Sequence, residues 1–253
     1  MMSYQTIFFN FFNCNHKLYN YKGLEENGFL FPGKLDEMAA FYAERAKGHV
    51  GLMVTGGIAP NNEGRAYFGA AKMSSESDVV NHSVVTKAVH ENGGKIAMQI
   101  LHTGRYAYHF FPVSASAIKS PIGWYKPTPL SSSDVTRTIR DFVKCAELAK
   151  KANYDGVEVM GSEGYLINQF LVERTNQRTD EWGGSYKNRM KFPVEIVKQT
   201  RKAVGNDFII IYRLSMLDLV DNGSSWEEVV ELAKAIEDAG ASIINTGNNI
   251  NFI

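Results

Sequence analysis

Apolar positions along the chain follow two periods that alternate from residue 34 onward. Apolar residues three or four positions apart predict helices, and short continuous apolar runs predict buried strands. Gly48 ends the first helical pattern, and Ser131 with Asp134 forms a capping box at the start of the third. The helices are expected at residues 35–46, 78–92, 131–149, 188–203 and 225–240, and the strands at 50–54, 95–101, 156–160, 208–214 and 241–245.

This order of elements predicts the fold. Strands separated by single helices pair in parallel through right-handed crossovers. No GxGxxG or GxxxxGK[ST] motif follows any strand, which favours a (β/α)8 barrel over a doubly wound nucleotide-binding sheet. Only five to six of the eight strands can be recognised. The expected fold is therefore an incomplete TIM (β/α)8 barrel, with a functional excursion at residues 105–129, which are rich in Tyr, Phe, Pro and Ser.

The two ends of the chain do not follow the pattern. Residues 1–22 show neither period, and they lack the basic segment and the cleavage site of a signal peptide, so we leave them as an unassigned leader. The last strand, at residues 241–245, is followed by a few residues and no helix. One edge of the sheet is therefore expected to lie uncovered.

Composition narrows the classes of function. Lys plus Arg and Asp plus Glu number 27 each, so no net field favours nucleic acid or an anionic membrane. No run approaches the ~20 apolar residues of a membrane span. Cys14 and Cys145 lie far apart without a CxxC motif, which disfavours a disulfide framework or a cysteine-ligated metal and suits a cytoplasmic location. We expect Cys145 to be a core residue.

The polar residues at the predicted strand ends suit one kind of chemistry. They lack HxH and HExxH motifs, paired carboxylates and a strand-end lysine, so a metal site, glycoside hydrolysis and an aldolase are disfavoured. They are rich in neutral hydrogen-bonding groups and include one cation, which suits a planar, electron-accepting ring with an amide-like edge. The set comprises Thr55, Gly56, Gln99, His102, residues 160–165 including Tyr165, Arg213, Ser215, Asn245 and Thr246.

Each of these residues also has a structural interpretation. Gln99 and His102 are compatible with satisfied structural polar groups, and Tyr165 with a residue that packs in the core. Arg213 stands in an otherwise apolar strand, so it must be paired or face a ligand, because a lone buried charge is too unfavourable. Asn188 and Arg189 are expected to brace the preceding loop.

Three long motifs carry a resemblance to a known family. They are GSEGYLINQFL, RTNQRTDEWGGSYKNRMKFP and FIIIYRLSMLDLV. They closely resemble the Old Yellow Enzyme family of flavin barrels, and most of all its bacterial 2,4-dienoyl-CoA reductase branch. The resemblance implies an FMN-dependent oxidoreductase that binds the flavin at the C-terminal mouth of the barrel and moves hydride from flavin N5 to an activated C=C bond.

The resemblance also implies roles for individual residues. Gln99 matches the residue that hydrogen-bonds the flavin pyrimidine edge, and Arg213 matches the one beside N1 and O2. Gly56 or Gly57 would underlie the ring. Tyr165 matches the proton donor that completes the reduction.

Two positions point to the dienoyl-CoA branch. Many ene-reductases place His and Asn over the flavin, and here those positions are Met160 and Glu163. The expected substrate is a small molecule, an unsaturated acyl-CoA or an enone-like compound. His102 and Arg174 are expected to contact it.

The chain departs from the family in three places. The family's first-strand motif is replaced by the leader, and Asn251 stands where a second catalytic group, a His, is expected. The last two strands, which supply amides for the FMN phosphate, are missing, as are the iron–sulfur segment and the FAD- and NADPH-binding half of full-length reductases. Residues 23–253 are thus interpreted as a partial FMN-binding barrel, truncated at both ends. The alternative to an active reductase is an inactive fragment without bound flavin.

Overall fold

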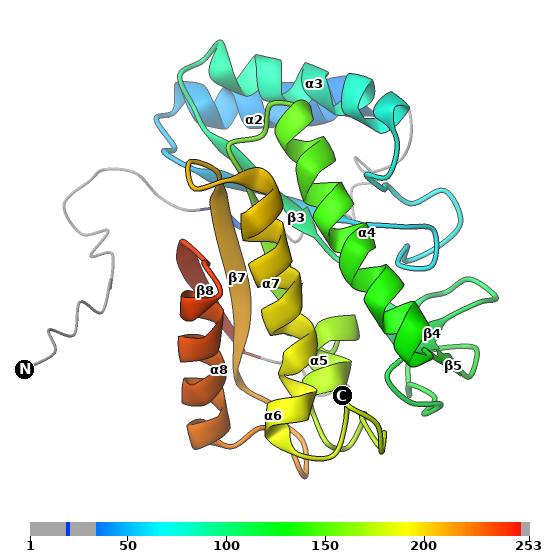
Figure 1. The fold of residues 1–253 in the computed structure, drawn as a ribbon. Helices are drawn as coiled ribbons and strands as arrows, with labels where there is room; N and C mark the ends of the chain where they lie inside the picture. Colours follow the sequence, from blue (N-terminus) through cyan, green and yellow to red (C-terminus); the bar gives the residue numbers. More distant parts are fainter. Residues whose placement is uncertain (1–18, 21–33, 249–253) are drawn as a thin grey trace, which may run out of the picture.

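A single parallel sheet forms the centre of the protein in the computed structural model, which describes residues 19–20 and 34–248 (Figure 1). Its strands are β1 (Tyr19–Asn20), β2 (Met53–Ile58), β3 (Ile96–Ile100), β6 (Gly156–Gly161), β7 (Ile209–Leu217) and β8 (Ile243–Asn248), in that spatial order. All five pairings between neighbours are parallel. The spatial order follows the chain without reversal, whereas a doubly wound sheet reverses its order at a switch point. The predicted incomplete (β/α)8 barrel is confirmed.

Long helices connect the strands and cover the outer face of the sheet (Figure 1). They are α2 (Leu35–Lys47), α3 (Glu76–His90), α4 (Ser132–Lys151), α7 (Lys191–Val204) and α8 (Trp226–Asp238). Shorter elements decorate the ends of the strands: the 3-10 turn η2 (Gly104–Tyr106), the paired β4 (Val113–Ser114) and β5 (Thr128–Pro129), α5 (Leu166–Leu171) and α6 (Tyr186–Arg189). No helix in the described part of the chain is long and apolar enough to cross a membrane.

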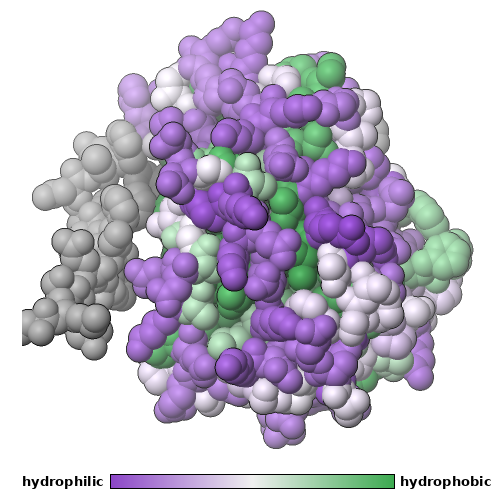
Figure 2. Space-filling model, viewed as in Figure 1, coloured by the Kyte–Doolittle hydropathy of each residue, from purple (hydrophilic) through white to green (hydrophobic). Residues whose placement is uncertain are grey.

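The two faces of the sheet bury different amounts of apolar surface. The large core lies between the sheet and the helices, where Tyr42, Phe142, Phe192 and Tyr212 are almost fully buried. The solvent side of these helices is mostly hydrophilic, and apolar side chains show in the seams between them (Figure 2). The face toward the barrel lumen carries a small apolar cluster of Val54, Ala97 and Ile211. This cluster is the apolar floor of the lumen, and the polar strand-end residues lie closer to the C-terminal ends of the strands than it does.

Local sequence signals explain several element boundaries. The predicted capping box of Ser131 and Asp134 is confirmed, and a second one joins Ser75 to Asp78 at the start of α3. Cys145 is fully buried on α4, as predicted for a core residue.

Three predicted boundaries were wrong. The strand expected at 50–54 runs from Met53 to Ile58, because its register shifts between Val54 and Gly57 and the glycines continue the strand instead of ending it. The helix expected at 188–203 is two helices, α6 and α7, that meet at Met190. The short helix α5 follows Tyr165 at a place where no helix was expected.

The unassigned leader contributes one short piece of the sheet. Tyr19 and Asn20 pair in parallel with Met53 and Val54, at the position of a first barrel strand. The rest of residues 1–22, and Asn251 at the other end, lie outside the described residues.

Candidate functional site

The polar residues predicted to form a site lie in two adjacent rows of the sheet. In the first row Gly57, Gln99 and Glu158 are in register on β2, β3 and β6. In the second, Met160, Arg213 and Asn245 are in register on β6, β7 and β8. Residues in register on parallel strands point to the same face, and residues two positions apart do so too. The side chains of Gln99, Arg213 and Asn245 therefore project toward the same face of the sheet.

Arg213 on β7 is held by the carboxylate of Glu163, which lies in the loop after β6. Its Nε and Nη2 atoms donate to Oε1 of Glu163 at 3.0 and 2.6 Å. Both side chains are largely buried, with 13% and 5% of their surface exposed. Glu163 has a φ of 61°, a left-handed conformation that is uncommon for a residue with a side chain. Arg213 was expected to be paired or to face a ligand, and in the structure it is paired with Glu163.

Glu158 is a functional candidate that the sequence analysis missed. Its side chain is fully buried and accepts a hydrogen bond from Asn245 Nδ2 at 3.1 Å, and Gln99 is its register partner on β3. Burial raises the pKa of Glu158, while Asn245, Arg213 and Gln99 oppose the rise. A glutamate in the middle of the apolar run GVEVM was the available signal, because a buried charge requires partners.

Tyr165 stands at the start of α5 and is half-buried. Its ring meets that of Tyr106 edge to face, with centroids 5.8 Å apart. Gly164 precedes it with a φ of 77°, and a Cβ atom there would lie 2.1 Å from the Tyr106 hydroxyl oxygen. Only glycine therefore permits this approach of the turn to Tyr106.

A cavity of about 340 Å³ lies beside Tyr165. Its wall is made mainly of small, apolar and aromatic residues: Gly57, Ala59, Gly64, Arg65, Ala66, Tyr67, Ala70, Ala71, Leu101, Thr103, Tyr106, Tyr108, Ile122 and Tyr165. Gly57, at the end of β2, and Tyr165, after β6, thus share one cavity. Gly56 precedes Gly57 in the same strand and is buried.

His102 lies behind this cavity wall. Its Nδ1 accepts a hydrogen bond from the backbone N–H of Gly104 at 3.1 Å, and its ring would lie 2.8 Å from a Cβ atom on Gly64. Burial lowers the pKa of His102 to about 3, so the ring is neutral at physiological pH. Its Nε2 atom is buried and has no partner among the described residues.

Arg174 is exposed in the loop after α5. Burial lowers the pKa of Arg105, and the positive charge of Arg174 lowers it further. Arg105 donates to the backbone carbonyl of Ile118 at 3.4 Å. The charge of Arg174 thus acts on a residue of the excursion at residues 105–129.

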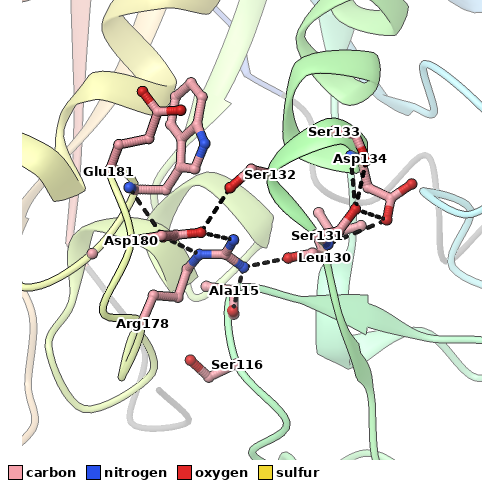
Figure 3. A network of polar contacts seen from close by, with 12 residues as sticks. Ala115, Ser116, Leu130, Ser131, Ser132, Ser133, Asp134, Arg178, Asp180 and Glu181 are labelled. Atoms are coloured by element: carbon pink, nitrogen blue, oxygen red, sulfur yellow. Dashed lines mark hydrogen bonds and ion pairs between the residues drawn. The ribbon is translucent and has the colours of Figure 1, made fainter.

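A polar network fastens the loop that carries Arg174 (Figure 3). Arg178 donates to the carbonyls of Ala115 and Leu130, and its Nε donates to Asp180 Oδ1 at 2.9 Å. Asp180 also accepts from Ser132 Oγ, at the start of α4, at 2.8 Å. Hydrogen bonding from Arg178 lowers the pKa of Asp180 to about 2. The network joins the loop, the excursion and α4.

Asn188 and Arg189 brace the other end of this loop, as predicted. Asn188 Nδ2 donates to the carbonyl of Gly183 at 3.0 Å. Arg189 donates to the carbonyls of Leu171 and Gly184, and its Nη2 pairs with Glu228 on α8 at 2.9 Å.

The residues present fit the ring of a flavin. A flavin ring is flat and has a pyrimidine edge that both donates and accepts hydrogen bonds. Gln99 and Arg213 bring an amide and a cation to one face of the sheet, and Gly57 leaves the neighbouring cavity wall without a side chain. The fold and this strand-end set are of the kind found in flavin-binding barrels.

A model of the NADH:flavin oxidoreductase / NADH oxidase family matches residues 27–251, and the chain belongs to this family, whose solved members include Old Yellow Enzyme homologues. The resemblance expected from the three motifs is confirmed. Family membership implies FMN as the cofactor.

Relatives and solved structures agree on this assignment. An NADH oxidase from Thermoanaerobacter brockii is 34% identical over 83% of the chain and 33% of its own length. A 2-naphthoyl-CoA reductase in complex with 2-naphthoyl-CoA is 33% identical with a TM-score of 0.78, covering 84% of this chain and 35% of that one. An Old Yellow Enzyme homologue from Zymomonas mobilis is 28% identical with a TM-score of 0.78, covering 86% and 64%. The chain thus spans about a third of the length of the NADH oxidase and of the 2-naphthoyl-CoA reductase.

Proposed function

We propose that this chain carries the FMN-binding mouth of a reductase that saturates an activated C=C bond, with Tyr165 as the proton donor. The observation that carries the proposal is the placement of Tyr165 and Gly57 on one cavity at the strand ends where Gln99 and Arg213 project. When bound, FMN supplies the hydride. The residues of the chain bind the ring, orient the substrate and deliver the proton.

Gln99 and Arg213 are the groups that would hold the ring. An amide recognises the pyrimidine edge, and a guanidinium stabilises negative charge at that edge after reduction. Arg213 is held in place for this task by Glu163, because two of its nitrogen atoms already donate to that carboxylate. Gly56 and Gly57 have no side chains, so the end of β2 leaves room for the ring.

Tyr165 is placed to act as a general acid. A phenol has a pKa of ~10, so it holds its proton at neutral pH until negative charge develops on the substrate. Its Oη proton would go to the carbon next to the one that takes up the hydride. The edge-to-face contact with Tyr106 and the tight turn at Gly164 hold the ring at the cavity wall.

An acyl-CoA thioester is the substrate class that we propose for this site. The 2-naphthoyl-CoA reductase resembles the chain in both sequence and structure, and Met160 and Glu163 match the dienoyl-CoA branch. Arg65 lines the cavity and Arg174 is exposed in the loop after α5, so both would supply cations for phosphates. His102 supports the cavity wall from behind Gly64.

An exposed aromatic cluster extends the cavity outward. Tyr108, which lines the cavity, meets Trp124 edge to face at 5.7 Å, and Phe110 contacts both Phe68 and Tyr125. Trp124 is 68% exposed. Exposed aromatic groups of this kind mark binding surfaces, and a flat base stacks on them favourably.

A pair of substrates tests the proposed class. 2,4-Hexadienoyl-CoA and the N-acetylcysteamine thioester of the same acid share the reacting diene and differ in the nucleotide. After FMN reconstitution, and with dithionite to reduce the bound flavin, both should be reduced, with a KM at least tenfold lower for the CoA ester, and Trp124→Ala should raise only that KM. Equal KM values would contradict the acyl-CoA class, and reduction of neither compound would contradict the reductase function.

A fragment without bound flavin is the second candidate, and the open lumen favours it. Ile209 and Ile243, which pack against the apolar floor of the lumen, are only partly buried. Apolar surface left open in this way calls for a partner or for further strands. Equilibrium titration with FMN separates the candidates, because this one predicts no saturable binding.

A further inference from the structure

Two amide side chains converge on one buried carboxylate beneath the strand-end layer. Asn245 Nδ2 of β8 donates to Glu158 Oε1 of β6 at 3.1 Å, and Gln99 of β3, the register partner of Glu158, lowers the pKa of that carboxyl by hydrogen bonding. Glu158 is fully buried and Gln99 is 6% exposed, so water has little access to these bonds. The charged groups that act on Glu158 are Arg213 of β7 and Glu163 of the loop after β6.

The chemistry of a carboxylate fixes how the two amides are turned. An ionised carboxylate only accepts hydrogen bonds, whereas an amide donates from nitrogen and accepts at oxygen. Gln99 and Asn245 must therefore each turn an NH2 group toward Glu158. Their carbonyl oxygens, Oε1 and Oδ1, are then directed away from it.

We infer that Glu158 is a positioning residue that makes Gln99 present a hydrogen-bond acceptor, and no donor, to the ring bound at the strand ends. The inference rests on the proposed function, because it assumes that a flavin binds beside Gln99. The pyrimidine edge of a flavin has one N–H donor, N3–H, between two carbonyl acceptors. An outward Oε1 on Gln99 selects that N3–H, while Arg213 supplies donors for the acceptors.

Glu158→Gln is the sharpest perturbation because it keeps the shape and removes the charge. A glutamine at this position has one accepting oxygen and one donating nitrogen. It satisfies one neighbouring amide as before, but its own NH2 group requires an oxygen from the other. The orientation of Gln99 is then no longer imposed, and the preference for an N–H on the ligand should weaken.

The test compares FMN with 3-methyl-FMN, in which a methyl group replaces the N3 hydrogen. Binding to the apoprotein is followed by quenching of flavin fluorescence, so no turnover is needed. The wild-type protein should bind FMN at least tenfold more tightly than 3-methyl-FMN, and E158Q should reduce this ratio to threefold or less. Asp155→Asn is the matched control, since it neutralises a carboxylate just before β6, at the opposite end of the strand from the site, and should leave the ratio above tenfold.

Two further measurements separate the possible failures. In a Gln99→Leu background, E158Q should have no additional effect on the ratio, because the group through which Glu158 acts is gone. A wild-type ratio near one, or an unchanged ratio in E158Q, would overturn the inference.

If the wild-type protein binds neither flavin, the proposed function fails, and the orientation of Gln99 is then measured from its side-chain NH2 signals in the NMR spectrum. Slow hydrogen exchange of these signals that accelerates in E158Q supports the role of Glu158, and fast exchange in the wild-type protein overturns it.

Discussion

Arg213 and Glu163 form a buried ion pair at the C-terminal ends of the strands, with Nη2 and Oε1 only 2.6 Å apart. The pair joins the loop before Tyr165 to strand β7, so the predicted proton donor and the predicted flavin contact are fixed relative to each other. It also supplies Arg213 with a negative partner in the absence of any ligand.

The first prediction concerns this negative partner. Glu163→Gln removes an anion that offsets the charge of Arg213, so a reduced, anionic flavin should gain more from Arg213 in the variant than in the wild-type protein. We expect the affinity for reduced FMN, relative to oxidised FMN, to rise about tenfold, which corresponds to a reduction potential higher by about 30 mV. Potentiometric titration of the reconstituted protein measures this shift, and a lower potential in E163Q would contradict the assigned role.

Tyr165→Phe is the second prediction, and it separates proton transfer from hydride transfer. The variant keeps the ring and its contact with Tyr106 but lacks the transferable proton. Removal of a general acid reduces turnover by about 10² to 10⁴-fold. Stopped-flow measurements should show slow reoxidation by the unsaturated substrate, with FMN binding retained. Wild-type reoxidation in Y165F would assign the proton to another group.

The third prediction concerns pH and the network in Figure 3. The pKa of Asp180 is lowered from 3.8 to about 2, so its carboxylate contributes stability above pH 3.8, and this contribution is lost as the pH falls toward 2. Asp180→Asn should lower the free energy of unfolding at pH 7 by about 1 kcal/mol, a value at the low end for charged hydrogen bonds because the carboxylate is partly exposed.

Urea unfolding at pH 7 and pH 2.5 measures this contribution. The difference in stability between wild-type protein and D180N should shrink at the lower pH. Asp207→Asn, at an exposed position in the loop before β7, is the matched control and should change stability by less than about 0.5 kcal/mol. An equal loss of stability in D180N at both pH values would assign its effect to packing instead of charge.

The fourth prediction follows from the raised pKa of Glu158. Protonation gives this side chain an O–H donor, so acid should act on the wild-type protein as E158Q does at neutral pH. The preference for FMN over 3-methyl-FMN should decline as the pH falls through the pKa of Glu158, and it should stay constant in E158Q. Fluorescence titrations between pH 5 and pH 8 measure both curves, and parallel curves would contradict the prediction.

Much of the fold was predictable because the spacing of apolar residues agrees with the glycines and capping residues that mark the ends of the helices. The helical patterns that end at Gly48 and begin at Ser131 lie within two residues of α2 and α4. The strand at β2 was misplaced, since Gly56 and Gly57 are typical of turns, and only the pairing with β3 keeps them in the sheet. The residues of β2 alone do not predict that pairing, because it depends on a strand about 40 residues further along the chain.

The site was predictable only in part. Position at a strand end and the family resemblance identified Gln99 and Arg213, and the register places both on one face of the sheet. The ion pair of Arg213 with Glu163 depends on a left-handed residue in a loop, and the convergence on Glu158 depends on three strands at once. Both are tertiary arrangements that spacing along the chain does not encode.

Equilibrium binding of FMN to the purified apoprotein decides whether these strand ends form a flavin site. We expect saturable binding of one FMN per chain, with quenched flavin fluorescence and an altered visible absorption band, and a loss of affinity of at least tenfold in Gln99→Leu. Flavin that retains the absorbance and fluorescence of free FMN at saturating protein would contradict the claim that these strand ends form a flavin site.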